Sequence, residues 1–575
     1  MSFLKTLFLV GFFILTSWPA SGQYIERMSK HMGEITSSQA QQRAASTLPG
    51  LTKPFAFASY YSSHMVLQKA PKRATIWGYA ANIGERIIIK VSERGTYTTK
   101  VYLDPLYNYG VWKLKLPAES SAGPFTITAI SREKTITLTD VMFGDVWVCS
   151  GQSNMQFTIT QGFNASEELA DANNYPNVRL FTVGDVPASF PIPDLHGIWE
   201  QWAVADKSSV GGKPWQYFSA VCWLFGKTLN KKLGYPIGLI DTSWGGTPVE
   251  AWSSTDALAK CGLDKQTSDI FIHRVKAFNE HQLGFDPITG IGGPSASSIL
   301  WNGMVFPLLN MTIYGAIWYQ GESNEVTNVH KYNCTFPAMI DDWRQKFHNA
   351  SDGETDSVFP FGFVQLAAYR PDSADPGFPE IRWHQTADYG YVPNPRMKNV
   401  FMSVAMDLPD FTSPYGSIHP RDKQDVVARL AVSGMSVAYN QQGEVTQGPL
   451  PANVQEGKKN FTLMYTEKIK YNNLVGFEAL CSVENSSKTF WTPTPILSAL
   501  PTSITLYSLV CGEGQTVLGL RYSWRETPCA FKTCTVYSAD NPLLPGPPFL
   551  VYRKMTGVAG TVHTIDWNTP TAIHN

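Results

Sequence analysis

The pattern of hydrophobic and polar positions changes twice along the chain. Between about residues 55 and 138, short runs such as RATIWGYA, ERIIIKVSE and GVWKLKLP alternate apolar with polar residues and are separated by turns. This pattern predicts an all-β domain of the sandwich type. From about residue 140 the apolar runs are nearly unbroken and alternate with helical stretches, as in DVWVCS, IGLIDTSW, YGAIWYQ and NVFMSVAMDL. Such strands predict a parallel sheet with helices on both faces.

Strand-like runs return after about residue 453, KNFTLMYT and SITLYSLVCG among them. We therefore expect an α/β fold class with N- and C-terminal β-rich, sandwich-like regions. A chain of 575 residues is too long for one core, so several domains are expected. The expected boundaries are 1–22 for a signal peptide, 23–54 for a lead segment, 55–139 for the N-terminal β domain, 140–453 for the catalytic domain and 454–575 for the C-terminal region.

The first residues, MSFLKTLFLVGFFILTSWPASGQ, have the organisation of a secretory signal peptide. One lysine precedes a short apolar run from Leu7 to Leu15, and the small residues that follow predict cleavage close to Gly22. The apolar run is too short to span a membrane, and no later segment approaches about 18 uninterrupted apolar residues. We expect a chain without membrane insertion that enters the secretory pathway and ends in the lysosome or outside the cell.

Potential glycosylation sites and cysteines agree with export. Six Asn-x-Ser/Thr triplets occur, at Asn164, Asn310, Asn333, Asn349, Asn460 and Asn485. The even number of cysteines, eight, favours disulfides in an exported chain. Two pairs are close enough in sequence to be natural partners, Cys481 with Cys511 and Cys529 with Cys534.

Charge and metal-binding patterns exclude some classes of function. The chain has 46 basic and 47 acidic residues and no long basic run, which argues against a nucleic-acid partner. No cysteine or histidine spacing resembles a zinc site, so we expect no metal.

In an open parallel sheet, ligands bind beyond the carboxyl ends of the strands, so the residues after each strand indicate the site. The first such stretch is CSGQSN, in which Gly151 permits a sharp turn that would expose the hydroxyl of Ser153. With a base nearby, that hydroxyl could attack a carbonyl carbon. An ordinary Ser- and Asn-rich turn explains this stretch alone equally well.

Two further strand ends carry hydrogen-bond donors and a carboxylate. In DTSWGGTPVEAW, Gly245 and Gly246 offer unobstructed N–H groups that suit an oxyanion, although a tight turn without a ligand would look the same. In AIWYQGESN, the strand ends in Gln320, Glu322 and Asn324. Their amides could donate to an oxyanion and the carboxylate could orient a histidine, although Glu322 alone is more typical of a solvated loop.

The last of these stretches is SPYGSIHPRDKQDVVARL. Pro420 and the acidic residues Asp422 and Asp425 predict the first turn of a helix there, which places His419 at its entrance. A lone histidine is usually structural. A serine after the first strand, a histidine after the last, and amides with a carboxylate between them together favour acyl transfer.

These motifs in this order resemble the sialate O-acetylesterase family, a branch of the SGNH hydrolase superfamily. The resemblance rests on GDVWVCSGQSNMQF, DTSWGGTPVEAW, WYQGESN and SIHPRDKQ, and it extends to MVLQKAPKRATIWGYA near the start and YSADNPLLPGPPFLVYR near the end. It implies an SGNH-type sheet and a serine esterase that removes O-acetyl groups, typically at the 9-position, from sialic acids or sialoglycoconjugates. The resemblance implies no cofactor.

The resemblance also assigns roles to residues of the four motifs. Ser153 would be the nucleophile and His419 the general base, later the acid. The oxyanion would be held by the backbone N–H of Ser153, by that of Gly246 or Gly245, and by the side chain of Gln320, with Asn324 as its substitute.

The orienting acid departs from the superfamily pattern, because Gly416 and Ser417 occupy the positions where an aspartate is expected before the histidine. Related carbohydrate esterases indicate Glu322 for this role, and Asp407 and Asp410 are the alternatives.

Other functions compatible with the motifs are an acetylesterase for another carbohydrate, such as xylan, and a secreted sugar-binding protein without turnover. A thiol enzyme that uses Cys149 is less well supported, because this residue lies inside an apolar strand, where a small buried hydrophobe is expected.

Overall fold

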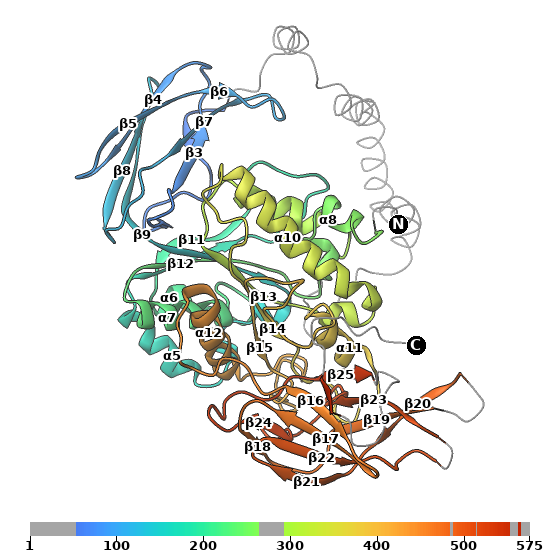
Figure 1. Cartoon of the computed structure of the whole chain (residues 1–575). Helices are drawn as coiled ribbons and strands as arrows, with labels where there is room; N and C mark the ends of the chain where they lie inside the picture. The colour runs from blue at the N-terminus through green and yellow to red at the C-terminus, as the bar shows by residue number, and fades with distance from the viewer. Residues whose placement is uncertain (1–52, 264–292, 483–486, 513–514, 553–561, 565–575) are drawn as a thin grey trace, which may run out of the picture.

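A computed structural model describes residues 53–263, 293–482, 487–512, 515–552 and 562–564. The expected signal peptide and almost all of the expected lead segment lie outside these residues. An N-terminal β region, a central α/β region and a C-terminal β region follow one another along the chain, and the two β regions lie at opposite ends of the molecule (Figure 1).

The N-terminal region consists of two sheets, as the alternating pattern predicts. In the order of pairing, the first contains β1 (Ala56–Phe57), β3 (Thr75–Tyr79), β7 (Gly110–Lys115) and β6 (Tyr102–Leu103). The second contains β5 (Gly95–Lys100), β4 (Arg86–Val91), β8 (Phe125–Ile130) and the first part of β9 (Thr135–Gly151). Alternate residues of β8 are buried, because one face of this strand packs on the core.

Strand β9 belongs to both the N-terminal and the central region. Its first part pairs with β8 in antiparallel fashion, and its second part pairs in parallel with β2 (Val66–Gln68), β12 (Ile237–Ser243) and β13 (Gly315–Tyr319). The boundary expected between residues 139 and 140 therefore falls inside one continuous strand of 17 residues. The shared strand ties the position of its end, where Ser153 follows, to both regions.

The central sheet has the strand order β11-β10-β12-β9-β13-β14-β15, and all neighbours are parallel except β11 and β10. Gly151 at the end of β9 lies opposite Ser243 of β12 and Tyr319 of β13, so these three strands end at the same level. The remaining strands are β10 (Val178–Val183), β11 (Ile198–Val204), β14 (Phe361–Gln365) and β15 (Val400–Val404).

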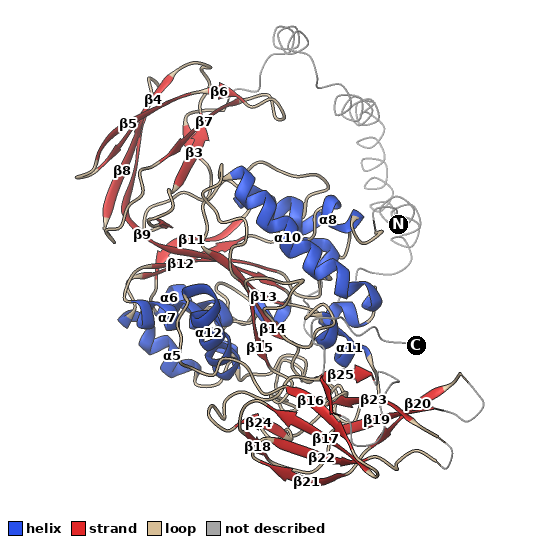
Figure 2. Cartoon of the chain, in the orientation of Figure 1, coloured by secondary structure: helices blue, strands red, loops and turns tan. Residues whose placement is uncertain are grey.

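Helices cover both faces of this sheet, with α7 and α12 on one side and α8, α10 and α11 on the other (Figure 2). The α-helices are α4 (Ser153–Gln156), α5 (Ala165–Asp171), α6 (Lys207–Val210), α7 (Ala220–Leu233), α8 (Thr255–Ala259), α10 (Tyr332–Ala350), α11 (Gly377–His384) and α12 (Lys423–Tyr439). Short 3₁₀ or π turns are η1 (Ile159–Gln161), η2 (Ala172–Asn174), η3 (Val249–Trp252), η4 (Trp301–Val305), η5 (Phe306–Leu308), η6 (Glu322–Glu325) and η7 (Val329–Lys331). Among the described residues, no helix is both long and apolar enough to cross a membrane.

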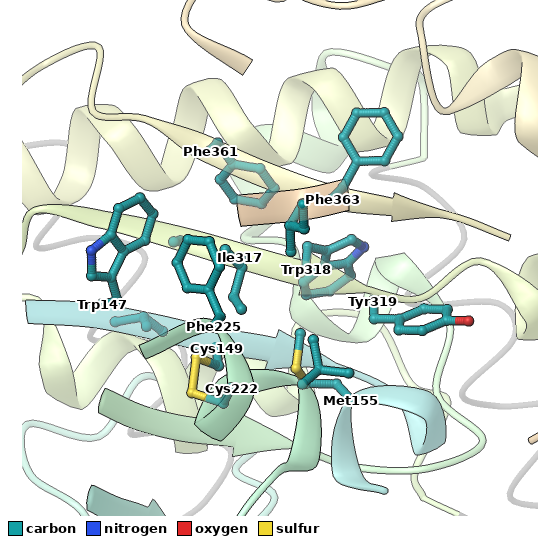
Figure 3. Close-up of a cluster of buried hydrophobic side chains, with 14 of the residues drawn as sticks. Trp147, Cys149, Met155, Cys222, Phe225, Ile317, Trp318, Tyr319, Phe361 and Phe363 are labelled. Carbon is teal, nitrogen blue, oxygen red and sulfur yellow. A yellow bond between two sulfur atoms is a disulfide. The ribbon is translucent and has the colours of Figure 1, made fainter. Parts of the chain in front are cut away.

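Large aromatic side chains fill the space between the sheet and its helices. Trp147 of β9 packs edge-on against Phe225 of α7, and the disulfide between Cys149 and Cys222 joins the same two elements (Figure 3). The sequence suggests a small buried hydrophobe at Cys149. It is indeed fully buried, but as half of a disulfide.

Four disulfides occur among the described residues. The two pairs predicted from close spacing, Cys481–Cys511 and Cys529–Cys534, are confirmed. The other two, Cys149–Cys222 and Cys261–Cys334, each join cysteines 73 residues apart, which close spacing could not indicate.

The C-terminal region contains only strands in its regular structure, again within the described residues. A five-stranded sheet is formed by β21 (Ile496–Leu500), β22 (Ser503–Tyr507), β17 (Asn460–Tyr465), β16 (Pro451–Glu456) and β26 (Val562–Thr564). A four-stranded sheet is formed by β20 (Thr489–Pro493), β19 (Phe477–Ser482), β23 (Val517–Tyr522) and β25 (Phe549–Tyr552), and a pair by β18 (Ile469–Tyr471) and β24 (Val536–Ser538). The boundary expected at residue 454 falls within β16.

Removing the buried disulfide should destabilise the protein more than removing a short one. Loop-closure entropy predicts a loss of about 4 kcal/mol for the pair of substitutions Cys149→Ala and Cys222→Ala, whose cysteines lie 73 residues apart. For Cys529→Ala with Cys534→Ala, which are 5 residues apart, the loss should be about 2 kcal/mol. Guanidinium unfolding under non-reducing conditions measures both. Equal losses would contradict this expectation.

Substitution of Gly151 should disrupt the end of β9. Its φ is 143°, and an added Cβ would lie 2.2 Å from the carbonyl oxygen of Tyr319. Gly151→Ala must therefore push β9 and β13 apart, and we expect a large fall in soluble yield and in thermal midpoint. Gly234→Ala is the matched control, because Gly234 has a φ of 74° but open space around it, so only a backbone penalty of about 1–2 kcal/mol should appear.

Candidate active site

Ser153 lies where β9 ends and α4 begins. The N–H of Gln152 donates to the carbonyl oxygen of Tyr319 at 2.9 Å, and its side-chain oxygen accepts from the N–H of Gly321 at 3.3 Å. These bonds tie the turn to the end of β13, which Gly151 allows to come close. The turn therefore holds the serine hydroxyl at the carboxyl edge of the sheet, where the sequence motif places it.

His419 reaches this hydroxyl from the loop between β15 and α12. Its Nε2 lies 2.8 Å from Ser153 Oγ, and its Nδ1 lies 2.7 Å from the carbonyl oxygen of Tyr415. A carbonyl only accepts hydrogen bonds, so Nδ1 carries the hydrogen and Nε2 presents its lone pair to the serine. This is the tautomer that a general base needs.

The histidine loop is held by its own backbone and by one ion pair. The N–H of His419 donates to the carbonyl of Gly416 at 2.9 Å, and the hydroxyl of Ser413 donates to the carbonyl of His419 at 2.8 Å. Arg421, two residues further on, donates to both carboxylate oxygens of Asp410 at 2.6 and 2.8 Å. The imidazole is therefore presented by a closely bonded turn.

The helix after His419 begins at Lys423, whereas the sequence predicts a start at Pro420. Asp422 is the N-cap, and its side chain accepts a hydrogen bond from the N–H of Asp425 at 3.0 Å. Asp422 has a ψ of 71°, outside the helical range, so the helix does not extend back through it to Pro420. The backbone N–H of Arg421 donates to Asp410, at 3.1 Å.

Glu322 lies in the wall of the site and is hydrogen-bonded to a neighbour of the nucleophile. Its Oε1 accepts from Nδ2 of Asn154 at 2.6 Å, while its buried Oε2 has no hydrogen-bond partner among the residues that the structure describes. The same Nδ2 donates to the carbonyl of Ile418 at 2.9 Å, and Oδ1 of Asn154 accepts from Nζ of Lys423 at 2.6 Å. Asn154 therefore connects the nucleophile turn, the histidine loop and two buried charged groups.

The other two candidate acids have arginine partners. Asp407 is bonded to two nitrogens of Arg429, at 2.5 and 3.0 Å, and accepts from the hydroxyl of Tyr537 at 2.8 Å. Asp410 is bonded to Arg421. Both carboxylates thus hold structure around the site, and the group that the structure shows at Nδ1 of His419 is the Tyr415 carbonyl.

Burial shifts the protonation of the two charged groups around Asn154 in opposite directions. It raises the pKa of Glu322, although the Asn154 hydrogen bond and the positive charge of Lys423 counteract this effect. It lowers the pKa of Lys423 to about 7, although Glu322 and two aspartates counteract that effect. Each group therefore favours the ionised form of the other.

The glycine pair follows β12 and lies beside the nucleophile turn, since the N–H of Trp244 donates to the carbonyl of Gly151 at 3.1 Å. The N–H of Gly245 donates to Oε1 of Gln156 at 2.8 Å and is thus engaged. Gly246 is exposed and has a φ of 73°. Of the two, Gly246 is the one that solvent can reach.

Gln320 and Asn324 do not present donors to a ligand. Gln320 is fully buried, and its Nε2 donates to the carbonyl of Thr247 at 3.1 Å and to Oδ1 of Asn324 at 2.7 Å. Asn324 is also fully buried, and its Nδ2 donates to Glu250 at 2.9 Å and to the carbonyl of Thr327 at 3.0 Å. The amide hydrogens of both side chains are therefore used within the protein and are not available to an oxyanion.

An aromatic residue beside the histidine was not identified by the sequence motifs. The ring of Trp215 lies 4.8 Å from that of His419, centroid to centroid, and also packs edge-on against Phe157 and Tyr415. Trp215 has a φ of 65°, a strained conformation for a bulky residue of the kind that collects at functional sites. No sequence signal marks it. Asn154 and Lys423, in contrast, lie within the GQSN and HPRDKQ motifs but received no role there.

Within the described ranges, no three His, Cys, Asp or Glu side chains are grouped so that they could hold a metal ion. The groups that meet at the site are the hydroxyl of Ser153 and the imidazole of His419, a pair that can perform nucleophilic acyl transfer.

A family model and a solved structure match large parts of this chain. Residues 451–553 match the family model described as the sialate O-acetylesterase C-terminal domain. A crystal structure of a carbohydrate acetylesterase from Xanthomonas citri aligns with a TM-score of 0.67 and 24% identity, covering 86% of this chain and 99% of that one. At this identity the match shows a shared fold.

Curated relatives match over most of the chain. Human sialate O-acetylesterase is 43% identical over 87% of this chain and 92% of its own length. The rat sialate O-acetylesterase is 43% identical over 88% of this chain and 95% of its own length. Identity at this level over nearly the full length of both partners shows that the chain belongs to the sialate O-acetylesterase family.

Proposed function

We propose that this protein is a serine esterase that hydrolyses O-acetyl esters of sialic acids, with the 9-O-acetyl group preferred. The observation that supports a serine esterase mechanism is the hydrogen bond between Ser153 Oγ and His419 Nε2, at 2.8 Å. The names of the curated relatives carry the substrate class. An SGNH-type arrangement of the catalytic sheet is part of this proposal, supported by the order of the strand-end motifs.

In the first half of the reaction, Nε2 of His419 takes the hydroxyl proton of Ser153 while Oγ attacks the acetyl carbonyl carbon. The oxyanion that forms accepts hydrogen bonds from the N–H groups of Ser153 and Gly246, and one such donor is worth about 3 kcal/mol of barrier. The bond from the carbonyl carbon to the sugar oxygen then breaks, and the imidazolium protonates the departing alcohol.

In the second half, a water molecule attacks the acetyl-enzyme. His419 takes a proton from the water, the tetrahedral intermediate collapses, and Ser153 recovers its proton as acetate leaves. The carbonyl of Tyr415 keeps the hydrogen on Nδ1 throughout, so Nε2 alone exchanges protons. Glu322 supports this base from the other side of Asn154, which donates to the carboxylate and to the histidine loop.

Substitution of either member of the Ser–His pair should abolish turnover. We expect Ser153→Ala and His419→Ala each to lower kcat by at least about a thousandfold, because the nucleophile or its base is lost. The thermal midpoint of each variant is measured beside activity. A folded variant with near wild-type turnover would overturn the mechanism, and failure of a serine-directed phosphonate to label the wild type would favour a sugar-binding protein.

The substrate class should appear as a ratio of rates. We expect kcat/KM for 9-O-acetyl sialic acid to exceed that for acetylated xylose, measured as acetate release under the same conditions. A higher value for the xylose ester would make the protein an esterase for another carbohydrate while leaving its mechanism intact.

The three candidate acids should separate by the property that each substitution changes. We expect Glu322→Gln to lower kcat and to cost less stability than Asp407→Asn, because burial lowers the pKa of Lys423 to about 7 and this lysine can release its proton once its anion is gone. Asp407→Asn should instead lower stability by about 3–5 kcal/mol, because it leaves the buried guanidinium of Arg429 without its partner. Asp410→Asn should loosen the histidine loop through Arg421. Unchanged kcat in Glu322→Gln would remove Glu322 from the active site.

We also propose that the protein is exported, to the lysosome or outside the cell, and N-glycosylated. The four disulfides support an oxidising compartment. The N-terminal sequence of protein recovered from a eukaryotic host should begin close to residue 22, and its glycopeptides should include some of the six acceptor triplets. Retention of Met1 in a cytosolic product would contradict export.

A further inference from the structure

Lys423 lies where a lysine is unfavourable for stability, both in its burial and in its position on the helix. It is fully buried, and it is the first residue of α12, where the helix dipole favours negative charge. Its ammonium lies over the rings of Phe157 at 4.6 Å and Tyr319 at 5.2 Å, which gives partial compensation as cation–π contacts. Violations of local preference that persist in a well-packed site indicate function.

The hydrogen bond of Lys423 connects it to both halves of the catalytic pair. Its Nζ donates to Oδ1 of Asn154 at 2.6 Å, and Asn154 follows the nucleophile directly in sequence. The Nδ2 of Asn154 donates to the carbonyl of Ile418, which directly precedes the histidine, and to Glu322. An asparagine is needed here, since only an amide accepts at one end and donates twice at the other.

The charged groups near Lys423 point to Glu322 as its counter-ion. Burial lowers the pKa of Lys423, and the charges of three carboxylates counteract this effect. They are Glu322 from η6 and Asp410 and Asp422 from the loop before α12. Asp410 is paired with Arg421, and Asp422 caps α12 and pairs with Lys532 at 3.3 Å. Among the described residues Glu322 forms no salt bridge, so its charge and that of Lys423 balance across Asn154.

In the described part of the chain, the other groups packed around Lys423 add no counter-charge of this kind. Asn154 comes from α4, Phe157 follows that helix directly, and Tyr319 comes from β13. Burial raises the pKa of Tyr319, so its hydroxyl stays neutral. His419 lies on the preceding loop and is bonded to Ser153 and Tyr415.

We propose that Lys423 is a positioning residue for this esterase: with Glu322 it clamps Asn154, which holds the backbone of the histidine loop against the nucleophile turn. The proposal rests on the function proposed above. It assigns Lys423 no contact with substrate, because its ammonium is enclosed by Asn154 and two rings. The clamp sets the distance between Oγ and Nε2, so its loss should lower kcat and leave KM nearly unchanged.

Because the charges of Glu322 and Lys423 cancel, single and double variants of these two residues should behave differently. Lys423→Met leaves the Glu322 carboxylate buried without its cation, and Glu322→Gln leaves the ammonium of Lys423 without its anion. The double variant removes both charges and restores neutrality. We expect each single variant to lower kcat by roughly tenfold or more, and the double variant to lose less than the product of the two losses.

The pH profile gives a readout that a purely structural role would not move. The positive charge of Lys423 lowers the pKa of Glu322, so in Lys423→Met the carboxylate takes up a proton at higher pH than in the wild type. The acid side of the kcat profile should therefore shift to higher pH in Lys423→Met. The shift should be absent when Glu322→Gln is also present, because the amide does not titrate.

Lys113→Met is the matched control. Lys113 is also a largely buried lysine whose pKa burial lowers, but it bonds to Asn310 and to the carbonyl of Ala350, away from the catalytic pair. We expect Lys113→Met to change the thermal midpoint while leaving the pH profile of kcat unchanged.

The experiment measures acetate release from 9-O-acetyl sialic acid between pH 4 and 9, together with the rate of phosphonate labelling of Ser153, on full-length protein. Labelling reports the reactivity of the Ser–His pair even where turnover is too slow to follow, and a single variant that does not fold is replaced in the comparison by the double variant. Multiplicative losses in the double variant, or an acid side that does not shift in Lys423→Met, would overturn the proposal. A wild type that neither turns over nor labels would instead overturn the proposed function.

Discussion

The hydrogen bond between His419 and Ser153 joins groups 266 residues apart, and the central region is arranged so as to keep it in place. The serine is positioned by β9, whose parallel pairing with β12 and β13 brings three strand ends to one level. The histidine is positioned by a turn that follows β15, at the edge of the same sheet. Asn154 joins these two placements, because it adjoins the serine and donates to the carbonyl before the histidine.

Much of this arrangement could be predicted from sequence because it depends on periodicity. Unbroken apolar runs indicate buried parallel strands, and parallel strands collect their following residues at one edge, so Ser153 and His419 could be expected to meet. The partner at Nδ1 could not be predicted, since every residue offers a backbone carbonyl and Tyr415 carries no mark of its role. Gln320 is of a suitable type for an oxyanion donor, but it is buried and its amide donates to Thr247 and Asn324. These contacts depend on the folded neighbours and cannot be read from the sequence.

Two sets of opposite buried charges near the site, Asp407 with Arg429 and Glu322 with Lys423, differ in whether the two groups touch. Asp407 and Arg429 meet directly through two hydrogen bonds, the geometry that best compensates desolvation. Glu322 and Lys423 are instead bridged by an amide, an arrangement that leaves Oε2 of the carboxylate without a partner. A pair kept for stability would gain from direct contact. Glu322 and Lys423 lack that direct contact, and they instead hold Asn154 firmly between the nucleophile turn and the histidine loop.

A carbonyl at Nδ1 has a consequence for the charge of the base. It fixes the tautomer as a carboxylate would, but it carries only a partial charge and stabilises an imidazolium less. A net negative charge nearby would make up the difference, yet Glu322 comes with Lys423, and together they are neutral. The network around Asn154 therefore acts on the distance between His419 and Ser153. Glu322 and Lys423 therefore act mainly by holding His419 and Ser153 in position. Their loss should lower kcat because the two catalytic groups are then less well oriented.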